Sequence, residues 1–197
     1  MVLSGVIAFY EHNDKLVSHK WLFAICYTCG CISGVWFLEY CVTYEDTYYR
    51  LMIIVTLTFI GLLASAVMMD LLWQEIYEFV WVVSAIGGGI CLAACRNVTV
   101  GIVISLALYF LMQETIMKYV YGIADCHAFC CCALFMAVNG LALEYYVLHM
   151  AISWLMLTVS QLICKNVDYK LKLKKPVAMI PHIASGLIVV TAFVHFP

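Results

Sequence analysis

Long apolar segments separated by short polar stretches make up most of this chain. A transmembrane helix needs about 20 mainly apolar residues to cross roughly 30 Å of hydrocarbon. Seven segments have this length, approximately 21–40, 51–70, 77–95, 98–117, 124–143, 145–164 and 176–196. Backbone polar groups must be satisfied inside each segment in lipid, and the sequence lacks the alternating pattern of a membrane barrel. The pattern therefore predicts an all-α, polytopic transmembrane bundle of about seven spans.

The composition points the same way. Of the 197 residues, 66% are hydrophobic and only 11% are charged, and the mean hydropathy is +1.01. A soluble domain does not need so much apolar surface, so we expect the chain to lie in a membrane, in contact with lipid. The formal net charge of -2 gives no indication of a nucleic-acid partner.

The basic residues predict the orientation of the chain. Cytoplasmic loops of membrane proteins carry an excess of Lys and Arg. With a cytoplasmic N-terminus and seven spans, eight of the ten basic residues fall inside. These are Lys15, Lys20, Lys118, Lys165, Lys170, Lys172, Lys174 and Lys175, whereas Arg50 and Arg96 fall outside. The lysine-rich stretch is read as a positive-inside loop, with contact to anionic lipid as the alternative.

Two aspartates stand at the ends of predicted spans. Asp70 closes the second span and Asp125 opens the fifth, with two complete spans between them. An even number of crossings returns the chain to the same face, so we expect both carboxylates at the cytoplasmic boundary, at similar depth. Charged side chains near hydrocarbon are rare and are functional candidates by default.

Two neighbouring carboxylates can carry out acid–base catalysis. An ionised one takes a proton from water, and a protonated one donates a hydrogen bond to the carbonyl under attack. Two like charges so close share a proton instead of both ionising. Asp125 lies at the positive end of its helix and Asp70 at the negative end of its own. We therefore expect Asp125 to act as the base and Asp70 as the proton donor, with the pair titrating jointly.

Other interpretations of the polar residues stay open. Asp70 and Asp125 can be interfacial carboxylates that face headgroups and water. Glu114, about one turn inside the fourth span, is read as a neighbour of the site or as interfacial, with direct catalysis as the alternative. We expect His149 and His182 to be buried and hydrogen-bonded between helices.

Eleven cysteines raise the question of a metal or redox site. Two clusters contain seven of them, CYTCGC from Cys26 and DCHAFCCC from Asp125. Three consecutive cysteines point in different directions around a helix and cannot all bind one ion, and no loop holds a second Cys pair at a matching spacing. We therefore read cysteine as a small apolar residue between helices and expect no cofactor and no metal. The glycines 87–89 in IGGGI are likewise read as close helix packing.

Two of these segments are similar to a known family. ASAVMMDLLWQEI, in which Asp70 is followed six residues later by Ile76, resembles the first catalytic segment of prepilin peptidases. These are membrane aspartyl proteases of the Gly-x-Gly-Asp type. YGIAD, which contains Gly122 and Asp125, resembles their second catalytic segment.

A third segment extends the resemblance to the end of the chain. KKPVAMIPHIASG, with Pro176 and Pro181, resembles the stretch that opens the last helix of the family. The resemblance covers roughly residues 51–197, which we interpret as a catalytic core of six spans. Residues 1–50 are interpreted as an N-terminal segment with the first span.

Three positions depart from the family pattern. Ala124 replaces the second glycine of the motif, His127 stands where the family usually has Lys, and Tyr77 stands where a proline is common. Since alanine does not easily adopt positive φ, the turn before Asp125 must use ordinary dihedral angles.

The resemblance implies an aspartic endopeptidase that cleaves the short basic leader from pilin-like precursors. The hydrophobic helix of such a precursor lies in the membrane, so cleavage is expected at the cytoplasmic face of the inner membrane. The chain has no room for the cytoplasmic insert of longer members, which implies cleavage without N-methylation. A small transporter with a proton relay and a non-catalytic membrane scaffold are the alternatives, and a relay favours acids staggered across the membrane.

Overall fold

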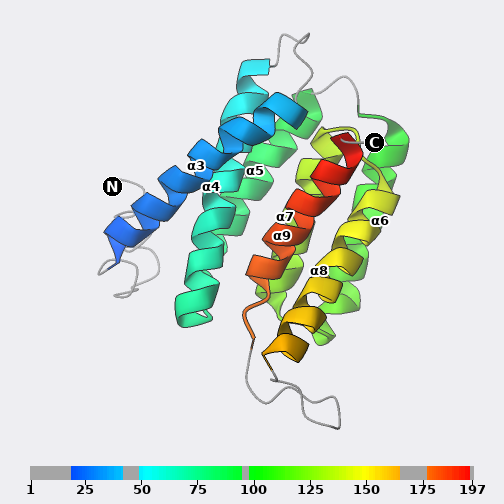
Figure 1. Cartoon of the computed structure of the whole chain (residues 1–197). Coiled ribbons are helices and arrows are strands. Elements are labelled where there is room, and N and C mark those ends of the chain that lie inside the picture. Colours follow the sequence, from blue (N-terminus) through cyan, green and yellow to red (C-terminus); the bar gives the residue numbers. More distant parts are fainter. Residues whose placement is uncertain (1–18, 42–48, 95–97, 165–176, 196–197) are drawn as a thin grey trace. The chain divides into compact units, whose positions relative to one another are not determined.

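The computed structural model describes residues 19–41, 49–94, 98–164 and 177–195. Within these ranges the chain forms α-helices and one short 3-10 helix and no strand, which confirms the all-α prediction (Figure 1). The elements are α3 (Lys20–Cys41), α4 (Tyr49–Trp73), α5 (Glu78–Ala94), α6 (Val100–Thr115), η1 (Met117–Tyr119), α7 (Ile123–Val138), α8 (Leu143–Ile163) and α9 (Ile180–His195). Lys15, Arg96, Pro176 and the lysines from 165 to 175 lie outside the described residues.

Three helices are long and apolar enough to cross a membrane. They cover Leu51–Trp73, Val100–Tyr119 and Leu143–Ile163. The other apolar helical stretches, over the residues whose side chains the structure describes, are 10–17 residues long and cover Lys20–Val35, Glu78–Ala94, Ile123–Val138 and Ile180–Val194. At about 1.5 Å per residue, a helix of that upper length measures about 25 Å, somewhat less than the hydrocarbon thickness. The helices thus support the membrane character of the chain.

The chain divides into two compact units, Met1–Gly87 and Gly88–Pro197. The boundary falls inside α5 and not at residue 50. The sequence division at residue 50 followed the family resemblance and stays a prediction.

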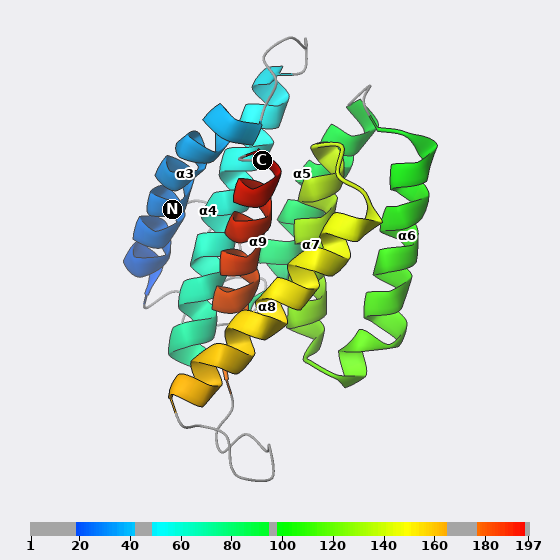
Figure 2. The same ribbon diagram turned by 45° about the vertical axis from the view of Figure 1, so that its right-hand side comes forward.

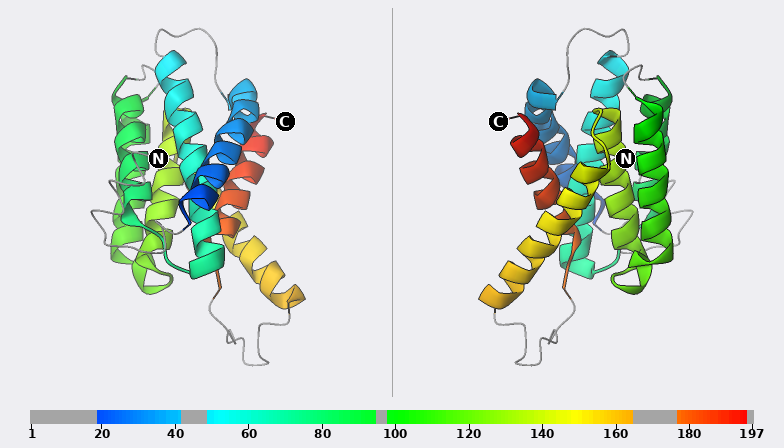
Figure 3. Two further views of the ribbon diagram at one scale, coloured as in Figure 1. Left: turned by 90° about the vertical axis from the view of Figure 1, so that its left-hand side faces the viewer. Right: turned by 90° about the vertical axis from the view of Figure 1, so that its right-hand side faces the viewer.

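In the first unit, α3 lies along α4 (Figures 1 and 3). Small residues line this contact. A Cβ atom built on Gly30 would lie 2.8 Å from the Cα of Gly61 and 2.7 Å from the Cβ of Ala64. Gly34, four residues further along α3, would similarly meet Leu57 at 3.0 Å. Small residues at this spacing let two helix backbones approach closely in a membrane bundle.

In the second unit, α7 is the central helix. It packs against α6, α8 and α9 (Figure 2). Every residue from Ala128 to Val138 is buried. A helix that is apolar on all sides is expected at such a position. Cys130, Cys131 and Cys132 belong to this buried stretch, so they pack between helices as small apolar side chains.

The end of α7 was predicted wrongly. The sequence placed the end of the fifth span at residue 143, but the helix ends at Val138. Gly140 adopts a left-handed φ of 79°, its N–H donates to the carbonyl of Ala137 at 2.9 Å, and the N–H of Leu141 donates to Met136 at 3.0 Å. These two bonds form a Schellman cap, which the residues Asn139 and Gly140 signal in the sequence.

The last helix also begins later than predicted, at Ile180. The carbonyl of Met179 accepts hydrogen bonds from the N–H groups of His182 and Ile183 at 3.0 and 3.1 Å. Pro181 therefore stands in the first turn of α9. A backbone N–H in this turn has no acceptor within the helix, so proline, which lacks the N–H, is tolerated there.

Of the glycines 87–89 in α5, Gly88 confirms the prediction of close helix packing. A Cβ atom on Gly88 would lie 2.6 Å from Cδ2 of Leu134 on α7, whereas a Cβ on Gly89 would meet nothing within 4 Å. Gly88 is therefore a close-packing glycine, and Gly89 is not.

Candidate active site

Asp70 lies on the inner face of α4. The helix continues past the predicted span end at Asp70 to Trp73, so Asp70 occupies its last turn. The side chain is only 7% exposed, and it continues a stripe of buried residues at helical spacing formed by Phe59, Leu63 and Ala66. The sequence places this carboxylate where an apolar side chain would otherwise stand.

The chain leaves α4 through a strained residue. Gln74 has a φ of 54°, and it is the one non-glycine residue with positive φ among the described residues. Its N–H donates to the backbone carbonyl of Asp70 at 3.1 Å, which caps the helix end. A left-handed conformation costs a residue with a Cβ about 1 kcal/mol or more, and such strain is often found at functional sites.

Asp125 lies in the first turn of α7. Gly122 is the N-cap, with φ -65° and ψ 159°, and Asp125 is the third helical residue after it. The N–H groups of Asp125 and Cys126 donate to the carbonyl of Gly122 at 3.1 Å each. No residue of this turn has positive φ, so the predicted turn with ordinary dihedral angles is confirmed for these described residues.

The carboxylate of Asp125 is folded back over its own helix start. A Cβ atom built on Gly122 would lie 3.5 Å from Oδ2 of Asp125. An acidic side chain at this place is stabilised by the positive end of the helix. The glycine at residue 122 leaves space beside the carboxylate, and its backbone conformation is one that any residue can adopt.

Asp70 belongs to the first unit and Asp125 to the second. The structure therefore describes the surroundings of each carboxylate, and their meeting stays a prediction. Glu114 and His127, in contrast, are brought together within the second unit.

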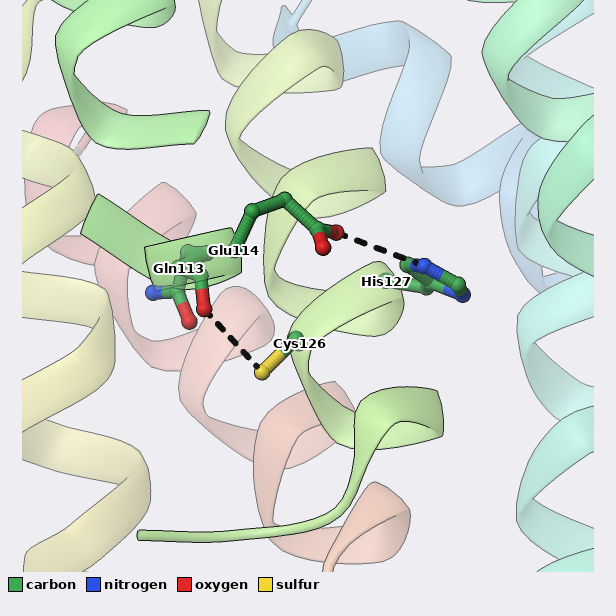
Figure 4. A network of polar contacts seen from close by, with 4 residues as sticks. All are labelled: Gln113, Glu114, Cys126 and His127. Carbon is green, nitrogen blue, oxygen red and sulfur yellow. Dashed lines mark hydrogen bonds and ion pairs between the residues drawn. The ribbon is translucent and has the colours of Figure 1, made fainter. Parts of the chain in front are cut away.

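A polar pair connects α6 and α7 close to Asp125. Figure 4 shows Glu114 reaching from α6 toward His127 on α7, with 3.4 Å between Oε1 and Nε2. The side chain of Glu114 is 51% exposed and that of His127 is 34% exposed. The thiol of Cys126 donates to the backbone carbonyl of Gln113 at 3.5 Å (Figure 4). Glu114 thus contacts α7 two residues after Asp125, and its role at the site stays a prediction.

The structure adds two polar residues that sequence reasoning missed. Gln113 is completely buried, and its Oε1 accepts a short hydrogen bond from the hydroxyl of Tyr121. Tyr121 directly precedes the N-cap Gly122. The signal in the sequence was an uncharged amide inside an apolar span, since such groups need a partner in a membrane.

The two predicted histidines take different positions. His149 is fully buried, and its Nε2 lies 2.9 Å from the carbonyl of Ile183 on α9. His182 is half-buried, and its Nε2 lies 3.3 Å from Oγ of Ser160. Both therefore bridge α8 and α9, which confirms interhelical hydrogen bonding for the pair and full burial for His149 alone.

No group of three or more His, Cys, Asp or Glu side chains is arranged to hold a metal ion within the described ranges. No protein-family model matches the chain, and neither a curated protein nor a solved structure shows significant similarity to it.

Proposed function

We propose that this chain is a membrane aspartic endopeptidase, similar to prepilin peptidases, with Asp70 and Asp125 as its catalytic dyad. Its substrate is a pilin-like precursor with a short basic leader and a hydrophobic helix. Cleavage takes place at the cytoplasmic face of the inner membrane, in a bundle of seven spans with a cytoplasmic N-terminus. The product is released without N-methylation.

The burial of Asp70 is the observation that carries this proposal. Removing a carboxylate from water costs several kcal/mol unless other groups compensate. A carboxylate that only faces headgroups and water has no reason to be 7% exposed on the inner face of an apolar helix. A buried acid in a membrane helix is a functional candidate, and this acid is the one that the family motif places at the site.

The helix ends support the division of roles between the two acids. Asp125 lies in the first turn of α7 and Asp70 in the last turn of α4. The helix dipole stabilises a carboxylate at the first position and destabilises it at the second. Asp125 therefore takes the proton from the attacking water, and Asp70 donates a hydrogen bond to the carbonyl oxygen of the scissile peptide.

The chain order is compatible with both acids lying at one membrane face. Two helices, α5 and α6, separate α4 from α7. If each of these helices crosses the bilayer, the end of α4 and the start of α7 lie on the same side. The cleaved bond, between a cytoplasmic leader and a membrane helix, lies at that same boundary.

Leader removal in cells tests the proposal directly. The chain is co-expressed with a pilin-like precursor, and the precursor is followed by mass spectrometry of its N-terminus. We expect Asp70→Asn and Asp125→Asn each to reduce cleavage to background, since the two acids act as a unit. The mature product of the unmodified chain is expected to carry no added methyl group.

Glu144→Gln is the matched control, because Glu144 is an exposed carboxylate in the first turn of another apolar helix, α8. This variant should cleave normally. Cleavage that persists in either aspartate variant would exclude the dyad. Proton uptake into vesicles that depends on the same aspartates, without any cleavage, would favour the transporter alternative.

A further inference from the structure

The turn before Asp125 is held by a side chain from another helix. We propose that Tyr121 and Gln113 form an anchor that positions Asp125, by fixing the place where α7 begins. This inference rests on the proposed function for its catalytic meaning, and the geometry of the anchor is independent of it. Tyr121 and Gln113 are positioning residues, since neither is expected to touch the substrate.

The anchor joins three helices of the second unit. The Tyr121 hydroxyl donates to Oε1 of Gln113 on α6 and lies 3.8 Å from Sδ of Met150 on α8. The ring of Tyr121 packs against Phe129 on α7, with centroids 5.4 Å apart, and against Trp154 on α8, with centroids 5.7 Å apart. Tyr121 is 9% exposed, so both the ring and the hydroxyl have fixed surroundings.

The side-chain amide of Gln113 makes its main hydrogen bond with Tyr121. Gln113 is completely buried, and its Nε2 lies 3.7 Å from Sδ of Met150. A thioether is a weak acceptor, so the hydrogen bond from Tyr121 is the strong one that this side chain makes. The backbone carbonyl of Gln113 also accepts from the thiol of Cys126, one residue after Asp125. One residue of α6 thereby contacts the chain on both sides of Asp125, at Tyr121 before the start of α7 and at Cys126 within α7.

The phenol keeps its proton at this site. Burial raises the pKa of Tyr121 above its ordinary value. Tyr121 is therefore a permanent donor near neutral pH, and the anchor does not depend on titration. A fixed start of α7 determines where Asp125 stands, because Asp125 follows Tyr121 by four residues.

Tyr121→Phe tests the anchor, because it removes the hydroxyl and keeps the ring. Tyr119→Phe is the matched control, since Tyr119 lies two residues earlier and is 82% exposed. The rate at which a hydrophobic carbodiimide modifies Asp125, read by peptide mass spectrometry, reports on the carboxylate without requiring cleavage. We expect a change of about 3- to 15-fold in Tyr121→Phe, the ratio that corresponds to one interhelical hydrogen bond, and none in Tyr119→Phe.

Cleavage kinetics provide the second measurement. A displaced base slows the chemical step more than substrate binding, so kcat should fall about tenfold in Tyr121→Phe with KM nearly unchanged. Gln113→Met has a similar length and no acceptor oxygen, and it should reproduce the effect. The double variant should change the labelling rate no further than either single variant.

The outcomes separate the two proposals. Equal labelling of Asp125 in the unmodified chain, Tyr121→Phe and Gln113→Met would overturn the anchor, whether or not the chain cleaves a precursor. Additive effects in the double variant would overturn it as well. If Tyr121→Phe does not fold, Gln113→Met gives the same comparison. Absence of cleavage by the unmodified chain would contradict the proposed function and leave the labelling comparison intact.

Discussion

At the residue scale, the one non-glycine residue with positive φ among those that the structure describes stands four positions after Asp70. Gln74 has positive φ and caps the end of α4 at the carbonyl of Asp70. A glycine is common at such a helix end. The sequence gives no sign of this, because glutamine has no preference for the left-handed region.

Gln74→Gly should therefore stabilise the protein, because glycine adopts this conformation without steric strain. We expect the free energy of unfolding to rise by up to about 1 kcal/mol. The midpoint of thermal unfolding in detergent measures the change. Gln74→Ala keeps the strain and should give no gain. A lower midpoint in Gln74→Gly would show that the glutamine side chain stabilises the fold by more than its backbone strain destabilises it.

The polar residues were predictable to different degrees. Asp70, Asp125 and Glu114 stand out in an apolar sequence because charge is rare in lipid. Gln113 and Tyr121 do not stand out, since tyrosine is common at span ends and a single amide carries no charge. Their pairing depends on α6 and the start of α7 lying side by side, which only the tertiary structure provides.

At the scale of the elements, some helical glycines lie at close contacts between helices and others do not. Gly30 and Gly89 are both helical glycines, but only Gly30 faces another backbone. The sequence could not distinguish them, because a glycine in an apolar helix can face either a neighbouring helix or lipid.

Gly30→Ala should weaken the packing of α3 on α4. The added Cβ would lie 2.8 Å from the carbonyl oxygen of Ile60 and from the Cα of Gly61, and a backbone cannot give way as a side chain does. We expect a loss of about 1–3 kcal/mol in the free energy of unfolding.

Gly89→Ala is the matched control, since its Cβ would meet nothing within 4 Å. Helix propensity alone should then stabilise it by up to about 1 kcal/mol. Unfolding in detergent compares the two variants. Equal effects would contradict the assignment of Gly30 to a close helix contact.

At the scale of the whole molecule, the central prediction is that two acids far apart in the sequence meet. Asp70 and Asp125 belong to separate compact units. Replacing both with cysteine and treating membranes with a short bifunctional thiol reagent should give a crosslink between residues 70 and 125. Fragmentation mass spectrometry distinguishes it from crosslinks of the native cysteines.

The combination of Asp70→Cys with Glu144→Cys is the control. Glu144 opens α8, and the predicted topology places it at the outer face, so no crosslink should form. A crosslink that forms only in the control would place residue 70 near residue 144 and not near residue 125. This result would exclude a shared catalytic centre of Asp70 and Asp125.

The sequence by itself determined the class of the protein and the rough extent of its helices. Apolar length and the need to satisfy backbone groups act along one segment at a time, so they can be read without knowing the neighbours. The Schellman cap at Gly140 was equally local, and it was present in the sequence although the prediction passed over it.

The tertiary structure decided which side chains are buried, and against what. The contact of Gly88 with Leu134 and the bond between Tyr121 and Gln113 arise from packing between helices. The low exposure of Asp70 is likewise a property of the folded chain and not of the sequence pattern. In a chain this apolar, the hydrophobic pattern does not distinguish a face covered by protein from a face covered by lipid. Only the arrangement of the helices makes that distinction.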